Sequence, residues 1–452
     1  MHRSLTLLLV LASCGGDKDD TPPPTEADTD TDTDTDTDTD SDADTDTDTD
    51  TLPPAVDFCP PLDAPTGTVI DVTTADTGNL QALIDLATTG DTLSFAAGTY
   101  DLNGETLWLR TDGVTLRGAT GNRDEVILDG GYVSGSILNV GASDVTIADL
   151  QVTRAYNHPI HVSPFDGRTI TGVKIYNVHL LDPGEQALKI NTDLTLTLFA
   201  DDGEVACSHL ELTDTGRPEI RNLCYTGGVD MHQGQDWVIR DNLIEGFWCD
   251  TGLSEHGIHI WRGTRGTRIE RNLVRENARG IGLGLGNDSI GRRYDDEPCS
   301  GQIAQDYDSL VLNNWVYVHD NDVFDSPSGM DVGIGLESAC NATVLHNTVY
   351  SDEAPFASID YRFERTTGVL ANNLVSHQLL RRDNATITVS SNHENAGDVM
   401  FVHTPSGDLH LAPLGTDAID NADPTWADQV LEDYDGDLRD ATPDIGADEF
   451  MP

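Results

Sequence analysis

The stretch TRIERNLV, residues 267–274, consists of a short apolar–polar alternation, a polar turn and a second short alternation. Alternation over three to five residues is typical of short, half-buried strands. The stretch recurs along the chain, with its central apolar residue repeating at intervals of 26 to 64 residues. A unit that recurs at just under 30 residues, with insertions, predicts a solenoid. The aligned apolar residues are Ile147, Ile175, Ile239, Ile269, Val311, Val344 and Leu370.

An asparagine follows the aligned apolar residue by three positions in five of these repeats. A buried side-chain amide needs partners for both its donor and its acceptor. Identical amides stacked at the inter-strand spacing, about 4.8 Å, satisfy each other from coil to coil. The repeats therefore predict an internal asparagine ladder. Its expected members are Asn242, Asn272, Asn314, Asn347 and Asn373.

Over about residues 66 to 450, this pattern resembles the right-handed parallel β-helix of pectate lyases and chondroitinase-B-like, polysaccharide-active proteins. The resemblance implies an all-β solenoid. Residues 79–102 add a short helix, ended by Gly90, that should cover the open edge of the first coil. One face of that helix carries Leu80, Leu83, Ile84 and Ala87.

The C-terminal stretch, residues 433–450, is similar to the terminal motif of β-helix surface proteins with a choice-of-anchor C-terminus. Asp433, Asp435 and Asp437 alternate within it. Such carboxylates suit either a closing turn, which we favour, or a Ca²⁺ site.

The N-terminus predicts export. Arg3 precedes an apolar run too short to span a bilayer, and LASC, residues 11–14, follows it. These residues resemble a bacterial lipobox, which implies cleavage before Cys14 and lipidation of its thiol; an ordinary secretory signal is the alternative. Gly15 favours the outer membrane, at the cell surface or facing the periplasm. We expect a lipoprotein signal at 1–14, an extended spacer rich in Asp and Thr at 15–56, and a β-helix domain at 57–452.

The charge excludes one class of partner. The formal net charge is -54, of which residues 1–51 hold -14, so about -40 remains on the rest of the chain. Nucleic-acid binding needs a basic face, so we expect no nucleic acid. We also expect a monomer that meets the membrane only through its lipid. A polyanionic substrate would need a local exception to this field.

The cysteines predict disulfides. Six remain besides Cys14, and an even number in an exported chain is typical of disulfide bonding. Disulfides between Cys207 and Cys224 and between Cys249 and Cys299 would each close a loop. Other pairings of the six cysteines remain open.

A second strand follows each asparagine turn, and its alternation separates inward from outward residues. Ionisable residues and one tryptophan occupy the outward positions of adjacent coils, before two coils of glycine. This pattern predicts a groove with a reactive end and an open floor. The outward set is His161, Ser163, Lys189, Asn191, Asp230, His232, His259, Trp261, Gly282, Gly284, Gly333, Gly335, Ser358, Asp360 and Arg362.

We favour a lyase that eliminates across a uronic-acid chain. GEQALKIN, residues 184–191, is similar to the acidic-then-lysine strand of chondroitinase-B and alginate-lyase type β-helices, whose lysine is the base and whose carboxylates hold calcium. The full acidic pair and the following arginine motif of that family are missing. A nearby Asp230 would also raise the pKa of Lys189 and weaken it as a base.

The candidate roles follow from that chemistry, which needs a base and a group that neutralises the substrate carboxylate. Lys189 or His259 would be the base, with Arg262 or Ca²⁺ neutralising the carboxylate. The candidate catalytic residues are Lys189, Asp230, His232, His259 and Arg262. The candidate substrate-binding residues are His161, Asn191, His256, Trp261, Gly282, Gly284, Gly333 and Gly335, and the candidate calcium ligands are Glu185, Asp230 and Glu255.

Three alternatives remain open. A hydrolase is one, because polygalacturonase-like NTD, DD, EHG and RIE stretches occur in order from residue 191, although their spacing departs from that family. A non-catalytic glycan-binding or adhesion module is the second. A metal centre at the histidines is the third; His256 and His259, three apart on a strand, should not easily face each other.

Overall fold

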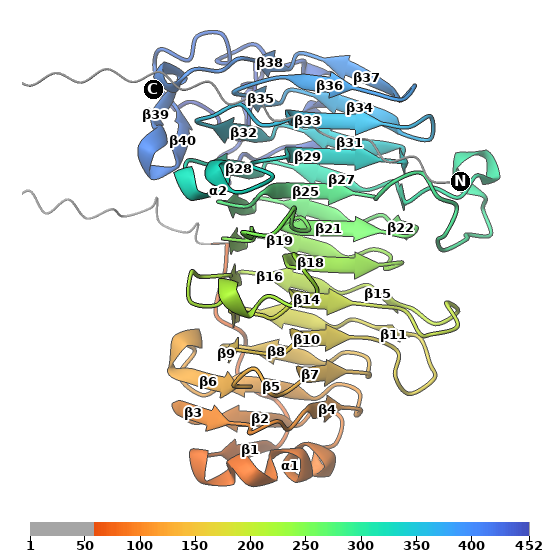
Figure 1. Cartoon of the computed structure of the whole chain (residues 1–452), viewed down its shortest axis with the longest axis vertical. Coiled ribbons are helices and arrows are strands. Elements are labelled where there is room, and N and C mark those ends of the chain that lie inside the picture. Colours follow the sequence, from red (N-terminus) through yellow and green to blue (C-terminus); the bar gives the residue numbers. More distant parts are fainter. Residues whose placement is uncertain (1–57, 452) are drawn as a thin grey trace, which may run out of the picture. The chain divides into compact units, whose positions relative to one another are not determined.

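The computed structural model describes residues 58–451, which form a right-handed parallel β-helix (Figure 1). Successive coils stack along one axis, and each contributes strands to three long parallel sheets, here called A, B and C. The predicted fold class is confirmed. Sheet A contains β1 (Val69–Val72), β2 (Thr92–Phe95), β5 (Thr115–Gly118), β8 (Thr146–Ala148), β12 (Lys174–Tyr176), β16 (Glu204–Ala206), β19 (Val238–Arg240), β23 (Arg268–Glu270), β27 (Leu310–Leu312), β31 (Ala342–Leu345), β34 (Thr367–Ala371) and β37 (Thr386–Ser390).

Sheet B follows sheet A in each coil, and sheet C carries the predicted groove residues. Sheet B contains β3 (Gly98–Asp101), β6 (Val126–Asp129), β9 (Gln151–Thr153), β13 (His179–Leu181), β17 (His209–Glu211), β20 (Leu243–Glu245), β24 (Leu273–Arg275), β28 (Trp315–Val318), β32 (Thr348–Ser351), β35 (Leu374–Val375) and β38 (His393–Glu394). Sheet C contains β4 (Leu107–Leu109), β7 (Ser136–Val140), β10 (His158–Val162), β14 (Gln186–Ile190), β18 (Gly227–His232), β21 (Ile258–Trp261), β25 (Arg279–Leu283), β29 (Val332–Glu337), β33 (Ala357–Arg362) and β36 (Leu379–Arg381).

Short strands extend the turns of the coils. They are β11 (Ile170–Thr171) with β15 (Ala200–Asp201), the row β22 (Thr264–Arg265), β26 (Asp306–Tyr307) and β30 (Ala339–Cys340), and the antiparallel pair β39 (Phe401–His403) and β40 (Asp408–Leu411). Two α-helices occur in the described residues, α1 (Leu80–Leu86) and α2 (Asn321–Asp325).

The asparagine ladder is present inside the coils. Nδ2 of Asn272 donates to Oδ1 of Asn314 at 2.9 Å, and the same bond joins Asn314 to Asn347. The ladder continues from Asn373 to Asn392, one step further than the repeats predict. Each amide also donates to carbonyl groups of the turn, so the buried polar atoms are satisfied.

The turn before each ladder asparagine is sharp because a single residue adopts a left-handed conformation. Asp241, Arg271 and Asn313 have φ between 49° and 54°. One such residue suffices to redirect the chain from a strand of sheet A to the next strand in sheet B, which keeps the aligned apolar residues in the core.

The helix α1 covers the first coil, as predicted. Leu80 and Ile84 are buried against the core, and the helix ends at Leu86, four residues before Gly90. The amide of Gln81 both accepts from the backbone N–H of Trp108 (2.8 Å) and donates to its carbonyl oxygen (3.1 Å). Gln81 thereby satisfies backbone groups at the open edge of sheet C, the capping that a solenoid end requires.

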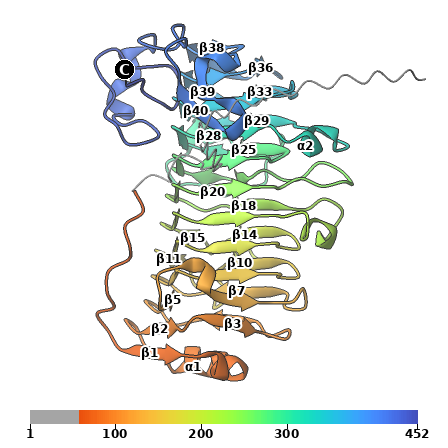
Figure 2. The same cartoon turned by 90° about the vertical axis from the view of Figure 1, so that its left-hand side faces the viewer.

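The N-terminal segment of the described chain runs along the outside of the coils to β1 (Figure 2). It starts at a disulfide between Cys59 and Cys207, and Pro60 accepts a hydrogen bond from the Tyr176 hydroxyl at 2.6 Å. Further along, Arg117 donates to the carbonyl oxygen of Leu62. The segment is therefore held to a middle coil before it reaches the first one.

The disulfides differ from the suggested staples. The pairs are Cys59–Cys207, Cys224–Cys249 and Cys299–Cys340, with Cα–Cα distances of 5.6, 6.0 and 6.3 Å. The suggestions Cys207–Cys224 and Cys249–Cys299 are wrong, because the fold brings each of these cysteines next to a different partner.

The C-terminal segment packs on sheet B. Trp315 stacks on Tyr434 with ring centroids 4.0 Å apart. Asp433 Oδ1 accepts from the backbone N–H groups of Asp435 and Asp437 at 2.9 and 2.8 Å. These hydrogen bonds hold residues 433–437 in a tight turn.

Within residues 58–451, we find no helix of the length and apolarity that a bilayer crossing requires. The predicted signal, Cys14 and the spacer at 15–56 lie outside the described residues, so lipidation and localisation stay predictions.

Candidate functional site

The outward face of sheet C carries a row of polar side chains from consecutive strands. The strand register pairs His161 with Lys189, Lys189 with Asp230, Asp230 with His259, and His259 with Gly282. The alternation in the sequence placed these residues on one face, and the structure has them in one row.

Lys189 and Asp230 form a buried ion pair at the centre of this row. Lys189 is 4% exposed; its Nζ contacts Oδ2 of Asp230, donates to the Tyr225 hydroxyl at 3.1 Å and lies 3.2 Å from Nε2 of His232. Oδ1 of Asp230 accepts from the Trp261 indole at 2.8 Å and lies 3.3 Å from His232 Nε2. Five side chains from three coils therefore form one connected group.

Burial and the neighbouring groups determine which members of this group are charged. Burial opposes the charge on Lys189, but Asp230 and Tyr225 outweigh burial and raise the pKa of the ammonium. Burial likewise favours a neutral Asp230, yet Lys189 and His232 hold the pKa of that carboxyl well below its usual range. Burial lowers the pKa of His232 and raises that of Tyr225. At neutral pH, an ion pair therefore stands beside a neutral imidazole and a neutral phenol.

Tyr225 is absent from the sequence-based set. It lies before β18, outside the alternation that identified the other residues. Its neighbour Cys224 is bonded to Cys249, so a disulfide holds the loop that delivers the phenol. The sequence signal that could have identified Tyr225 is its position next to a cysteine.

Trp261 and Arg262 lie beside the group. The Trp261 ring stacks on the His259 imidazole, with centroids 5.2 Å apart and planes at 5°. The Arg262 guanidinium carbon lies 4.5 Å from the centroid of the Trp261 ring, and Arg262 Nε is buried without a hydrogen-bond partner in the described residues. Much of the indole is thus engaged within the protein, which leaves less of it for a sugar ring.

His161 and Asn191 contact each other at the other end of the row. Nδ2 of Asn191 lies 3.1 Å from Nε2 of His161. Burial, and then the neighbouring His158 and Lys189, lower the pKa of His161 to about 3, so its imidazole is neutral. A neutral imidazole accepts the amide hydrogen bond here.

Glu255, His256 and His259 converge, against the expectation that the two histidines face apart. Glu255 and His256 precede β21, so strand alternation does not govern them. Oε2 of Glu255 lies 3.2 Å from Nδ1 of His259, and the two imidazole centroids are 4.7 Å apart. One ligand atom from each residue lies within 4.8 Å of the other two.

The predicted glycine floor is partly covered. A Cβ on Gly282 would lie 2.7 Å from the His256 ring, so that imidazole rests on the glycine. Gly335, paired with Gly282, lies next to the same ring, and Gly284 follows β25 with φ of 82°. His256 therefore occupies space that the sequence assigned to a substrate.

The outward assignment of Gly333 is wrong. A Cβ at this position would collide with Cγ1 of Val349, a core residue of sheet B. At the corner between sheets B and C the chain bends, and Gly333 is needed there for close packing rather than for an open surface.

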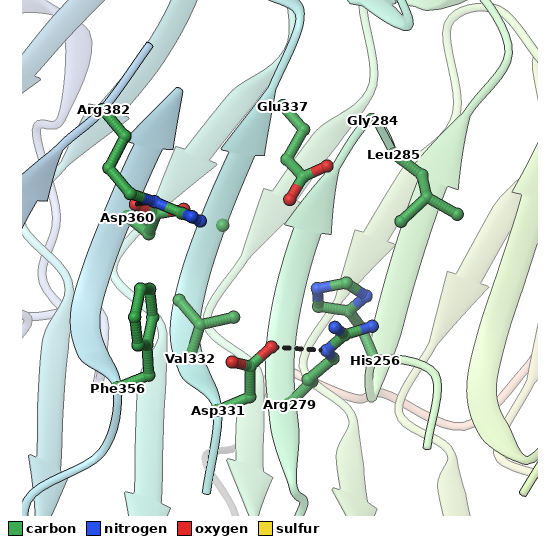
Figure 3. A pocket seen from close by; sticks show the side chains of 11 residues that line it. His256, Arg279, Gly284, Leu285, Asp331, Val332, Glu337, Phe356, Asp360 and Arg382 are labelled. Carbon is green, nitrogen blue, oxygen red and sulfur yellow. Dashed lines mark hydrogen bonds and ion pairs between the residues drawn. The ribbon is translucent and has the colours of Figure 1, made fainter. Parts of the chain in front are cut away.

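A polar pocket follows the glycines on sheet C (Figure 3). Arg279 donates to Asp331 at 2.7 Å across it, and Arg382 donates to Asp360. Its wall also includes His256, Glu337 and Phe356. Because both arginines are paired, the pocket has no net cationic centre of its own.

The three proposed calcium ligands do not converge within the described residues. Asp230 is engaged by Lys189 and Trp261, and Glu185 contacts Asn222 and lies 3.4 Å from His158. Ca²⁺ requires six to eight oxygen ligands. Glu185, Asp230 and Glu255 are not a converging cluster within residues 58–451, so no step is assigned to calcium here.

The fold and this sheet define the class of protein: a parallel β-helix with a polar cluster on one outer sheet. The chain belongs to the family described as protein of unknown function (DUF1565), whose model matches residues 80–352. A search of curated protein sequences finds no match.

Solved structures share the fold at low identity. A pectate lyase, Pel9A, is 14% identical, with a TM-score of 0.54 over 85% of this chain and 97% of its own. An alginate lyase from Paenibacillus sp. str. FPU-7 is 17% identical, with a TM-score of 0.49 over 73% of this chain and 99% of its own. The tailspike protein of E. coli bacteriophage HK620, solved with a pentasaccharide, is 13% identical, with a TM-score of 0.42 over 75% of this chain and 65% of its own. At these identities the likeness shows the fold alone.

Proposed function

We propose that this protein is a polysaccharide lyase that cleaves a uronic-acid chain by β-elimination on sheet C. The observation that carries the proposal is the Lys189–Asp230 ion pair with the neutral His232 and Tyr225 held against it. Perturbed titratable groups in one cluster are typical of catalytic sites. The shared fold with a pectate lyase is consistent with the proposal.

In the reaction, His232 takes the proton from the carbon next to the uronate carboxylate. The electron pair that is released forms a carbon–carbon double bond, and the bond to the leaving glycosidic oxygen breaks. Tyr225 gives its hydroxyl proton to that oxygen. The step therefore uses one group that is unprotonated and one that is protonated at neutral pH.

The ion pair stabilises both charges that this transfer creates. The imidazolium of His232 would lie beside the Asp230 carboxylate, and the phenolate of Tyr225 beside the Lys189 ammonium. Charges placed in advance where new charge develops lower the barrier. Lys189 therefore acts as a stabilising cation rather than as the base, since Asp230 keeps it protonated.

Arg262 is our candidate for the group that binds the substrate carboxylate. Its guanidinium lies beside Trp261, whose indole donates to Asp230, and it forms no ion pair within residues 58–451. Arginine binds carboxylates through paired N–H groups. Arg262 would also supply the local positive charge that a polyanionic substrate needs on an otherwise negatively charged protein.

Hydrolysis by Asp230 and Glu255 fits less well. One carboxyl group of such a pair acts as a protonated acid and the other as a free base or nucleophile. Asp230 is held ionised by Lys189 and is covered by the Trp261 indole. It is therefore poorly placed for either role.

The test is incubation with pectate, alginate and chondroitin, while ultraviolet absorbance is followed for unsaturated ends. We expect this signal from one of these polymers, and a fall in kcat of about 100-fold or more in His232→Gln and in Tyr225→Phe, the usual size of an acid–base contribution. His403→Gln, an exposed histidine in the C-terminal segment, is the control and should keep full activity. Reducing ends without absorbance would indicate hydrolysis, and retardation in a glycan gel without cleavage would indicate a binding module; either result overturns the lyase.

A further inference from the structure

In the cluster of Glu255, His256 and His259, each side chain has one buried polar atom without a hydrogen-bond partner within residues 58–451. They are Oε2 of Glu255, Nδ1 of His256 and Nδ1 of His259. His259 is fully buried and His256 is 5% exposed. Buried polar atoms are normally satisfied, so three unsatisfied atoms in one place point to a shared ligand.

We propose that these three residues bind one divalent transition-metal ion, of which zinc is the model. Two imidazole nitrogens and one carboxylate oxygen form a ligand set that zinc uses in proteins. Their mutual separation, within 4.8 Å, allows a single ion to contact all three after small side-chain adjustments. Calcium would not fit, because it prefers oxygen ligands in larger number.

The surroundings of His259 support a ligand role for its Nδ1 atom. Nε2 of His259 lies 3.2 Å from the carbonyl oxygen of Gly284 and can donate its hydrogen to it. In the tautomer that makes this bond, Nδ1 carries the free lone pair, 3.2 Å from Oε2 of Glu255. A backbone carbonyl bound to the far nitrogen is a recurrent support for histidine ligands.

The other histidines that cluster with acidic residues in the described part of the chain already have polar partners for their ring nitrogens. In the group of His179, His209 and Glu211, both nitrogens of His179 contact carboxylates, and His209 Nε2 lies 2.6 Å from Glu245. Those imidazoles are already partnered. They provide a control, because they are histidines that cluster with a carboxylate on another outer sheet.

Three protein ligands leave a coordination position for water or for a substrate group. The Glu255 side chain is 22% exposed, so solvent reaches the site from that side. His259 also stacks on Trp261, whose indole donates to Asp230. The ion would thus fix His259 and, through it, the Trp261 ring that contacts Asp230. Metal binding does not require lyase activity.

The test uses the full chain with its disulfides intact, stripped with a chelator and titrated with Zn²⁺ by calorimetry. We expect one tight equivalent, lost by at least about 100-fold in affinity in His256→Gln and in Glu255→Gln, more than the loss typical for outer-shell partners. His209→Gln should keep it. Weak binding to the aspartate-rich spacer is common to all variants and cancels in the comparison.

Cobalt provides a second readout that does not rely on affinity. Co²⁺ in the wild-type protein should give the visible absorption of a low-symmetry nitrogen and oxygen site, absent from His256→Gln, while circular dichroism shows both proteins folded. The proposal is overturned if the wild type binds no tight Zn²⁺, if the tight equivalent persists in both ligand variants, or if His209→Gln removes it.

Discussion

Replacing Asn314 by alanine should destabilise the protein more than the same change at the end of the asparagine ladder. Oδ1 of Asn314 accepts from the backbone N–H and from Nδ2 of Asn272, at 3.0 and 2.9 Å. Its Nδ2 donates to Asn347 Oδ1 and to the carbonyl oxygens of Ile269 and Leu312, at 2.9 to 3.0 Å. Asn314 is fully buried, so water does not replace these bonds.

The magnitude follows from the groups left behind. The N–H of Asn272 loses its acceptor, which costs about 1–3 kcal/mol, and each further hydrogen bond lost costs about 1 kcal/mol. Counting one bond for each hydrogen of its Nδ2 and one from Nδ2 of Asn272, we expect Asn314→Ala to lower the free energy of unfolding by roughly 4–6 kcal/mol. Asn392 also accepts from the asparagine before it but is half-buried, so water compensates there and we expect a loss of about 1 kcal/mol.

Urea denaturation of the wild type, Asn314→Ala and Asn392→Ala measures these differences. Asn314→Asp extends the series, because it keeps an acceptor for Asn272 but turns a carboxylate oxygen towards acceptors that Nδ2 formerly bonded. Its destabilisation should grow as the pH rises and the buried carboxyl ionises. Equal losses at positions 314 and 392 would refute the reasoning that burial of the stack is what makes each amide costly to remove.

Three other outcomes follow from the fold. Burial raises the pKa of Asp306 to about 7, so between about pH 4 and pH 7 the folded state keeps a proton that the unfolded state has released. The free energy of unfolding should therefore fall by roughly 4 kcal/mol over this range because of Asp306 alone. In Asp306→Asn, the urea midpoint should change less over the same pH range. Gly280→Ala places a methyl group against a backbone carbonyl of the next coil and should cost at least about 2 kcal/mol in the same assay, whereas Gly135→Ala, with open space around it, should be near neutral. Gln81→Ala removes both bonds to the edge of sheet C at Trp108, and hydrogen exchange at β4 should accelerate while that at β25 stays unchanged. Unchanged exchange at β4 would show that the helix alone protects the edge.

The sequence predicts the solenoid because its signal is repeated. Each short strand is ambiguous alone, but ladder positions such as Asn272 and Asn314 recur in register, and only stacked coils satisfy them together. Asn392 escaped detection because the coil that carries it is short, 19 residues after Asn373. The disulfide from Cys59 escaped because its partner is 148 residues away, on a coil that the N-terminal segment passes only in three dimensions.

The sequence predicts the positions of those site residues that lie within strands, but not of those that lie in loops. Period-two alternation places Lys189 and Asp230 correctly, since both lie in the middle of strands. Tyr225 and the pair Glu255 and His256 lie in turns before strands, where direction depends on local backbone geometry and not on a period. Gly333 shows the complementary error, because alternation fails where the chain turns a corner.

The covalent bond between Cys59 and Cys207 determines where a pull on the chain would act. A force transmitted from residues before 58 would reach the solenoid at a middle coil and not at its first one. The early coils would then bear no tension, and β1 would not be pulled away from β2. In a single-molecule stretching experiment, reduction of this bond should convert resistance to a sudden load into stepwise unwinding from the N-terminal end.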